Sequence, residues 1–156
     1  MKSNVFILLF MFAQYSYANE CRNNEVLIAS CNISGEVPKI ATFCANEKSE
    51  TIRYTFSKNG SSDLTVNFDE QHKLKRWVDL GTYTTYFGFV RGAYSYVLLV
   101  PEEKPSAVAI LEVKKNGDVI SSKNCDTNSF GTQDIKMKTI DDVPDSFVRE
   151  NGFKFP

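Results

Sequence analysis

The chain has 156 residues, with 18 Lys or Arg and 19 Asp or Glu, so its formal net charge is −1. This balance excludes the basic field of a nucleic-acid-binding protein and the acidic tail that some chains carry. Its 12 Phe and 7 Tyr favour strands and a packed core.

The first 18 residues are typical of a secretory signal peptide. Lys2 precedes the apolar run Val5–Phe12, and Ser16 and Ala18 supply the small residues before a cleavage site at Asn19. The apolar run is shorter than the roughly 20 residues that span a bilayer, and no Cys follows the cleavage site directly. We therefore expect a soluble periplasmic or secreted protein without a membrane anchor.

Alternation of apolar and polar residues predicts β-strands over most of the mature chain. Leu64, Val66 and Phe68 share one face of such a strand, and Thr65 and Asn67 share the other. We expect eight strands, at about residues 25–33, 38–45, 51–57, 62–69, 82–90, 94–101, 106–115 and 118–124.

Turn residues separate these strands at regular intervals. Asn59-Gly60 and Asn116-Gly117 supply the positive φ angles of hairpin turns, and Arg91-Gly92-Ala93 forms a third turn. The pattern predicts an all-β fold, an eight-stranded antiparallel β-sandwich or flattened barrel. Residues 94–100 are apolar on both faces, which suits a strand covered on each side.

Two segments depart from the strand pattern. Residues 70–81 are predicted to be a long connection with room for one helical turn. Residues 126–156 are predicted to be a tail that covers one edge of a single β-domain spanning 19–156. The tail contains a short helix with Asp142 as its N-cap and Pro144 in its first turn. The residues expected to dock on the sheet are Phe147, Val148, Phe153 and Phe155.

Four cysteines in an exported chain predict two disulfides, with three connectivities open. Cys31 and Cys44 lie on consecutive predicted strands, so we prefer a cross-strand bond between them. This leaves Cys21 to pair with Cys125. A zinc site is the alternative, but the chain has no CxxC motif and His72 is its single histidine, so we expect no metal or other cofactor.

No catalytic motif stands out, and we do not expect an enzyme. His72 lies in a charged segment without a nucleophile motif beside it, so a solvated surface role is expected. Glu102-Glu103 and Asp141-Asp142 are adjacent carboxylates that point apart on an extended chain, whereas acid–base work needs two carboxyls that face one substrate.

Two segments are candidates for binding a partner. The turn Arg91-Gly92-Ala93-Tyr94 holds a charged donor between aromatic strands, and a donor so presented can pair with carboxylates in an acidic cleft. Lys73, Arg76 and Trp77 are candidates for a secondary contact with an anionic or sugar partner. The alternative is a solvated loop whose Trp packs inward.

One pattern spans residues 25–125: a Cys, a Gly-containing turn, a Lys, a second Cys, a Tyr-x-Phe strand, a Gly-x-Tyr turn and a final Cys. The residues that carry it are Cys31, Gly35, Lys39, Cys44, Tyr54, Phe56, Gly92, Tyr94 and Cys125. In this the chain resembles the periplasmic lysozyme inhibitors. The resemblance implies an eight-stranded antiparallel fold and a Ser-Gly-x-Tyr loop that enters the lysozyme cleft and blocks the catalytic acids. Arg91 stands where that motif has Ser, so only Gly92 and Tyr94 match.

The first functional hypothesis is an exported inhibitor that blocks a lysozyme-type muramidase with the hairpin at residues 91–94. A variant of it is a periplasmic immunity protein against a secreted antibacterial toxin. The hypothesis from a different class is a β-barrel that binds a small apolar ligand in its mouth, and such a binder must contain a cavity.

Overall fold

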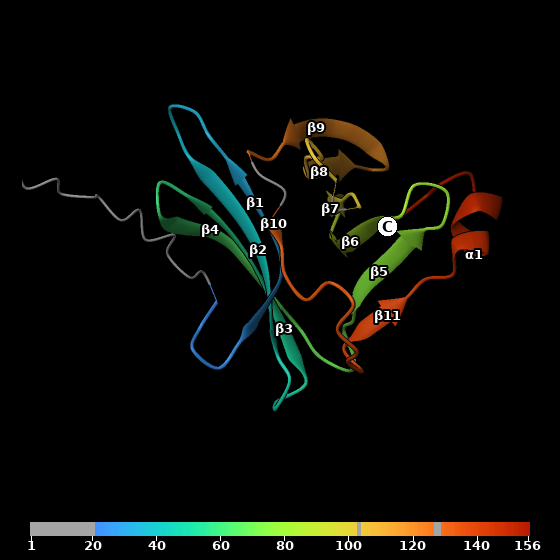
Figure 1. Cartoon of the computed structure of the whole chain (residues 1–156), viewed down its shortest axis with the longest axis horizontal. Helices are drawn as coiled ribbons and strands as arrows, with labels where there is room; N and C mark the ends of the chain where they lie inside the picture. The colour runs from blue at the N-terminus through green and yellow to red at the C-terminus, as the bar shows by residue number, and fades with distance from the viewer. Residues whose placement is uncertain (1–20, 103, 127–128) are drawn as a thin grey trace, which may run out of the picture.

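A computed structural model describes residues 21–102, 104–126 and 129–156 (Figure 1). The predicted signal peptide, residues 1–18, lies outside them. The described residues form eleven strands and one helix: β1 Val26–Ile33, β2 Lys39–Asn46, β3 Thr51–Lys58, β4 Ser61–Phe68, β5 Leu74–Asp79, β6 Thr84–Arg91, β7 Tyr94–Val100, β8 Ile110–Lys115, β9 Asp118–Asn124, β10 Ser129–Phe130, β11 Ile140–Asp142 and α1 Asp145–Glu150. No helix within these ranges is long and apolar enough to cross a membrane.

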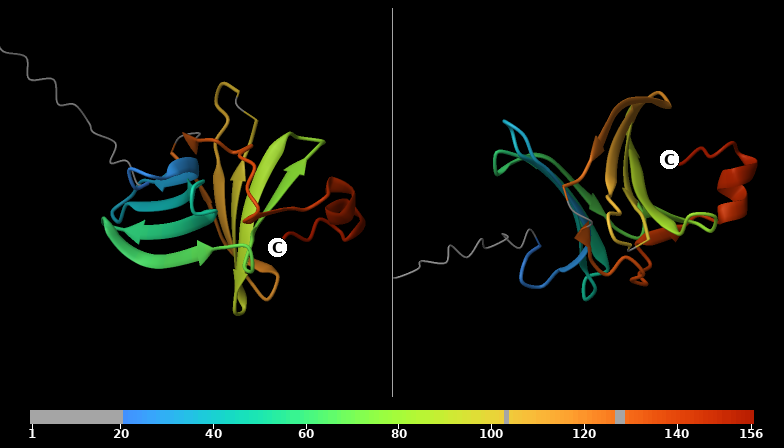
Figure 2. Two further views of the ribbon diagram at one scale, coloured as in Figure 1. Left: turned by 90° about the horizontal axis from the view of Figure 1, so that it is seen from below. Right: turned by 45° about the horizontal axis from the view of Figure 1, so that its top comes forward.

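The strands form two sheets that face each other (Figures 1 and 2). Sheet A has the order β10-β1-β2-β3-β4, and sheet B has the order β11-β5-β6-β7-β8-β9. Neighbouring strands are antiparallel except β11, which runs parallel to β5. The all-β sandwich is therefore confirmed, whereas the barrel alternative and the count of eight strands are wrong.

The eight predicted strands are all present, because alternation directly reports a sheet with one buried face. Their observed ends lie within four residues of the predicted ones, the largest difference being the start of β8 at Ile110. The predicted β3–β4 hairpin turn is confirmed, with φ of 49° at Asn59 and 75° at Gly60. Positive φ at both central positions is the requirement of a type I′ turn.

Aromatic side chains fill the space between the sheets. The ring centroids of Phe43 and Tyr54 in sheet A lie 4.8 Å apart. From sheet B, Phe89 packs 4.9 Å from Tyr54 and 5.1 Å from Tyr96. Offset and edge-to-face ring contacts at these separations add to the stabilisation that burial alone provides.

A second cluster covers the outer face of sheet B. It comprises Trp77, Val97, Val148 and Phe155, so α1 and the chain end supply half of it. Leu98, next along β7, packs in the core between the sheets. The prediction that residues 94–100 are covered on both faces is therefore confirmed.

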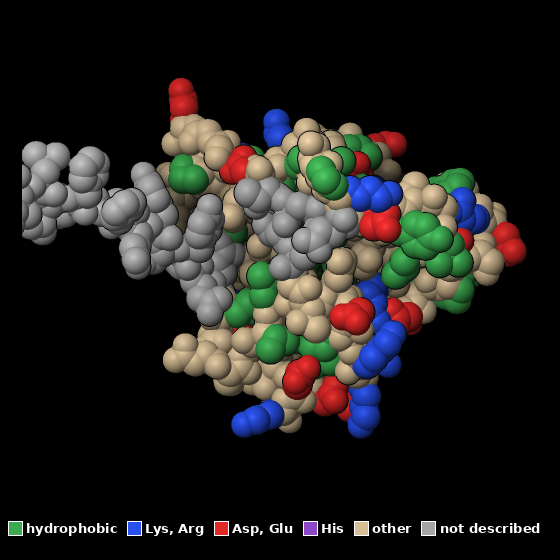
Figure 3. All heavy atoms as spheres, in the orientation of Figure 1, with side chains coloured by type: hydrophobic (Ala, Val, Ile, Leu, Met, Phe, Trp, Pro, Cys, Tyr) green, Lys and Arg blue, Asp and Glu red, His purple; other side chains and the backbone are tan. Residues whose placement is uncertain are grey.

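The tail differs from its prediction in three respects. It pairs with an edge of each sheet, since β10 pairs with β1 and β11 pairs with β5. Helix α1 begins at Asp145 with Pro144 as its N-cap, because Asp142 is hydrogen-bonded in β11 instead. Phe147 and Phe153, which were expected to dock on the sheet, are each 57% exposed. Figure 3 shows hydrophobic side chains gathered on the surface near α1.

Residues 74–79 form strand β5, so the prediction of a long connection there is wrong. Arg76 and Asp79 are buried in this strand, at 3% and 7% exposure. Because both residues are charged, the sequence pattern predicts a solvated loop. In the structure, however, residues of the tail neutralise both charges. Arg76 pairs with Asp142, and Asp79 pairs with Arg149.

The disulfide pairing expected from the sequence is also wrong. The structure joins Cys21 to Cys44 and Cys31 to Cys125. The first bond ties the N-terminal segment to β2. The second ties β1 of sheet A to the residue that follows β9 of sheet B.

Strand register explains why Cys31 and Cys44 cannot pair. Cys31 lies opposite Ala41 and Cys44 lies opposite Leu27, three residues farther along the ladder. This offset is about 10 Å along the strand, beyond the Cα separation that a disulfide spans. Cys31 also faces the core, whereas Cys44 alternates with the core residue Phe43 and points to the opposite face.

Candidate functional site

The β6–β7 hairpin presents the predicted turn at the surface. Arg91 and Tyr94 are paired across the hairpin, and all four residues of the turn are exposed. Gly92 has φ of 62°, whereas Ala93 is outside the positive-φ region. This combination defines a type II′ turn, which matches the twist of the flanking strands. It fixes the direction in which residues 91–94 project, and we call these four residues the tip.

A second hairpin supports this tip from one side. The N–H of Asn116, in the β8–β9 turn, donates to the carbonyl of Ala93 at 2.8 Å. Lys115 Nζ lies 5.6 Å from the centroid of the Tyr94 ring, within cation–π range. The two turns therefore lie side by side at one end of sheet B, where the left view of Figure 2 shows them at the bottom.

An open groove of about 530 Å³ runs beside the tip, between β4 and strands β5 and β6. We call it the basic groove because its lining includes Lys73, Lys75 and Arg91 together with His72, and no Asp or Glu is among these described lining residues. On the other flank of the tip, a hollow of about 660 Å³ carries Glu112 as well as lysines. The excess of positive charge therefore lies on the groove side.

The acid nearest to the groove in sequence is committed to its own turn. Asp69 Oδ1 accepts hydrogen bonds from the N–H groups of Gln71 and His72, each at 2.8 Å. These two hydrogen bonds, the one from His72 being the larger cause, hold the pKa of Asp69 below its usual value. The carboxylate therefore stays ionised and holds the turn that carries Lys73 into the groove.

Within the part of the chain that is described, the Arg91 guanidinium has no hydrogen-bond or ion-pair partner. An exposed, unpaired guanidinium on a fixed turn is ready to form a bidentate pair with a carboxylate. The site is thus a cationic tip with a cationic groove on its flank, suited to an acidic partner surface.

Of the three residues predicted for a secondary contact, one is exposed and two are buried. Lys73 is exposed and lies in the basic groove with Arg91. Arg76 and Trp77 are each 3% exposed, so neither can contact a partner at the surface. Trp77 stacks on Tyr86 at 4.3 Å and donates from Nε1 to Asp145 at 3.0 Å, as in the alternative of an inward-packed Trp.

The sequence interpretation missed Lys75 and His72 as groove residues. Lys73 and Lys75 are two residues apart, and this spacing places both on one face of an extended segment. The signal was therefore present, but it has meaning only once residues 74–79 are recognised as a strand.

One cluster of described residues has the donor types of a metal site: Cys21, Glu25 and Cys44. The two cysteines form a disulfide with each other, and only a thiolate ligates a metal. Glu25 is also occupied, since both its oxygens accept hydrogen bonds from Arg53 at 3.2 and 2.6 Å. The cluster is therefore structural.

No protein-family model, no curated protein and no solved structure matches this chain. The resemblance to the periplasmic lysozyme inhibitors accordingly stays a prediction from the sequence motifs. The function proposed below rests on the geometry and charge of the tip and the basic groove.

Proposed function

We propose that this chain is an exported inhibitor of a lysozyme-type muramidase and that it inserts the β6–β7 tip into the enzyme's cleft. The observation that carries the proposal is Arg91, which has no partner among the described residues, on an exposed type II′ turn beside the basic groove. The protein acts by binding and has no turnover of its own.

The chemistry of the target matches this tip. Glycoside hydrolases of this class place two Asp or Glu side chains on either side of the scissile bond. A guanidinium that enters the cleft can donate to both oxygens of one such carboxylate in a bidentate pair and so prevent it from acting as acid or nucleophile. Gly92 lets the backbone approach the cleft wall closely, and Tyr94 supplies a rigid aromatic contact.

The hairpin also limits the entropic cost of binding. A two-residue turn between paired strands has little freedom to lose, and the hydrogen bond from Asn116 to Ala93 restrains it further. Lys73 and Lys75 in the groove would face the acidic rim of the cleft and increase the association rate by electrostatic steering.

The test is inhibition of purified lysozymes of the three main types by the mature, oxidised protein. We expect inhibition of at least one type, and Arg91→Ala should weaken it by about 1–3 kcal/mol, roughly 5- to 150-fold, as for a lost charge-assisted hydrogen bond. Arg91→Lys retains the charge without the bidentate geometry and should recover only part of the loss.

Lys48→Ala is the matched control, because Lys48 is an exposed cation in the β2–β3 turn, outside the tip and the groove. Wild-type protein that inhibits none of the enzymes contradicts the proposal; an immunity function through the same tip would then be the next to test. Inhibition that Arg91→Ala leaves unchanged removes Arg91 from the interface but not the inhibitory function.

A further inference from the structure

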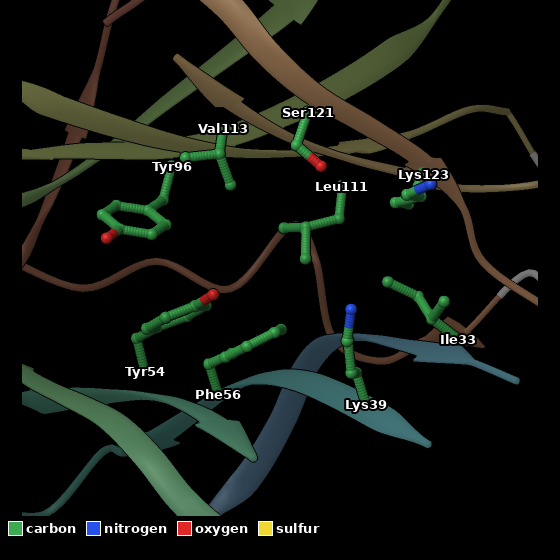
Figure 4. A pocket seen from close by; sticks show the side chains of 9 residues that line it. All are labelled: Ile33, Lys39, Tyr54, Phe56, Tyr96, Leu111, Val113, Ser121 and Lys123. Atoms are coloured by element: carbon green, nitrogen blue, oxygen red, sulfur yellow. The ribbon is translucent and has the colours of Figure 1, made fainter. Parts of the chain in front are cut away.

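A cavity of about 90 Å³ lies between the sheets and shares no lining residue with the basic groove or with residues 91–94 (Figure 4). The cavity is partly open to solvent, and apolar side chains from both sheets line it, among them Phe56 of β3 and Leu111 and Val113 of β8. Water occupies about 30 Å³ per molecule in the liquid, so the space corresponds to about three waters or one short hydrocarbon group.

The Tyr54 hydroxyl is the first sign that this cavity takes a ligand. Tyr54 is 1% exposed, and its hydroxyl has no hydrogen-bond partner among the described residues. In Figure 4 the hydroxyl points into the space between Phe56 and Leu111. Burial raises the pKa of this phenol above its usual value, so the group stays protonated and can donate.

Two lysines that line the cavity are the second sign. Lys39 has the same strand parity as the core residues Ala41 and Phe43, and in Figure 4 its ammonium group is directed at the cavity. Lys123 of β9 lies opposite Leu111 in the ladder and also lines the cavity, although its side chain is exposed to solvent. The two sheets thus contribute one cation each.

Neither lysine has an acidic partner within the described ranges. An inward-pointing charge on an edge strand can serve to prevent edge-to-edge aggregation, and β9 is an edge strand. That explanation covers Lys123 but not Lys39, because β2 lies inside sheet A between β1 and β3. The position of the Lys39 ammonium group at the cavity therefore needs a different explanation.

We propose that the cavity binds a small amphipathic carboxylate. Its apolar part lies against Phe56, Leu111 and Val113, and its carboxylate pairs with Lys39 and Lys123 at the mouth. The Tyr54 hydroxyl donates to the ligand from the closed side. The volume limits the enclosed apolar part to roughly three carbon atoms, with further methylenes at the mouth, so a short-chain fatty acid is the matching class.

The test is a calorimetric and NMR titration of the mature, oxidised protein with hexanoate, with hexanol as the uncharged probe. We expect saturable one-to-one binding of hexanoate, with the largest shifts in signals of β3 and β8. Lys39→Met should weaken hexanoate binding about tenfold and leave hexanol binding unchanged. Tyr54→Phe keeps the ring volume and should weaken hexanoate about fivefold, as for one lost hydrogen bond.

Lys48→Met is the matched control, since it removes an exposed cation in the β2–β3 turn that does not line the cavity, and it should change nothing. Absence of saturable hexanoate binding by the folded wild-type protein overturns the proposal and means that the cavity holds water only. Hexanoate binding that Lys39→Met leaves intact overturns it as well. None of these measurements uses an enzyme target, so their failure is independent of the inhibitor proposal.

Discussion

Arg76 shows how one side chain fixes the tail to the sandwich. Its guanidinium makes a bidentate pair with Asp142, at 2.5 and 2.8 Å, and donates to the carbonyls of Gln133 and Ile135, each at 2.9 Å. A charge that is 3% exposed is tolerable only when acceptors replace its hydration. The tail therefore supplies the acceptors that allow Arg76 to be buried in β5, and Arg76 in turn holds the tail against the sheet.

Removal of the charge on Asp142 should destabilise the protein. Asp142→Asn keeps the shape of the side chain but leaves the buried guanidinium without a counter-charge, and we expect a loss of about 2 kcal/mol in the free energy of unfolding. Urea denaturation measures this loss. Asp141→Asn is the control, because Asp141 lies in the same strand but its side chain has no hydrogen-bond or ion-pair partner among the described residues. An equal loss in both variants would contradict the role of the pair.

Glu25 should make stability depend on pH. Its side chain is 7% exposed, and the hydrogen bond from Arg53 is the largest cause that holds its pKa below the usual value of 4.5. A carboxyl whose pKa is lowered in the folded state contributes stability above its unfolded pKa. That contribution is lost as the pH falls through the folded pKa.

We therefore expect the free energy of unfolding to fall as the pH decreases below about 4.5, and Glu25→Gln to make this decrease shallower. Denaturant unfolding at several pH values between about 2 and 7 measures the slope. Glu36→Gln provides the comparison, since Glu36 is exposed in the β1–β2 turn. A slope that Glu25→Gln leaves unchanged would show that other carboxyls cause the acid sensitivity.

At the scale of elements, the strands were predictable where one face is buried and the other solvated. Leu64, Val66 and Phe68 report such a face directly, and β4 lies within one residue of its predicted range. Strand β5 was not predictable in this way, because Arg76 is buried by acceptors 57 to 66 residues away in sequence. A local pattern contains no information about such partners.

The basic groove should act mainly on the rate of association. Lys73→Ala with Lys75→Ala removes two cations beside Arg91 without touching the core, since both side chains are exposed. We expect the double variant to associate with its enzyme about tenfold more slowly at low salt, with a smaller difference at high salt where charges are screened. Stopped-flow inhibition at two ionic strengths measures this. A loss that appears only in the dissociation rate would instead place these lysines in direct contact.

At the scale of the whole molecule, the tip was found from the sequence but the cavity was not. The Gly92 turn is a local signal, and the structure confirms an exposed hairpin there. The cavity is lined by residues of both sheets, among them Lys39 and Lys123, and only the three-dimensional packing of the sheets brings them together. The disulfide pairing was partly predictable from the sequence. Cys44 follows the core residue Phe43 in the same strand, so alternation already places Cys44 on the outer face of sheet A.

The two disulfides should contribute unequally to the stability of the sandwich. Cys31–Cys125 closes a loop of 94 residues between the sheets, and Cys21–Cys44 closes one of 23 residues within the sheet A side. In the chain-entropy model these loops correspond to about 4.7 and 3.4 kcal/mol of restricted unfolded-state freedom. Cys31→Ser with Cys125→Ser should therefore lower the melting temperature more than Cys21→Ser with Cys44→Ser. Peptide mapping without reductant must first show these two pairs in the wild type; a Cys31–Cys44 peptide would contradict the register on which the ranking depends.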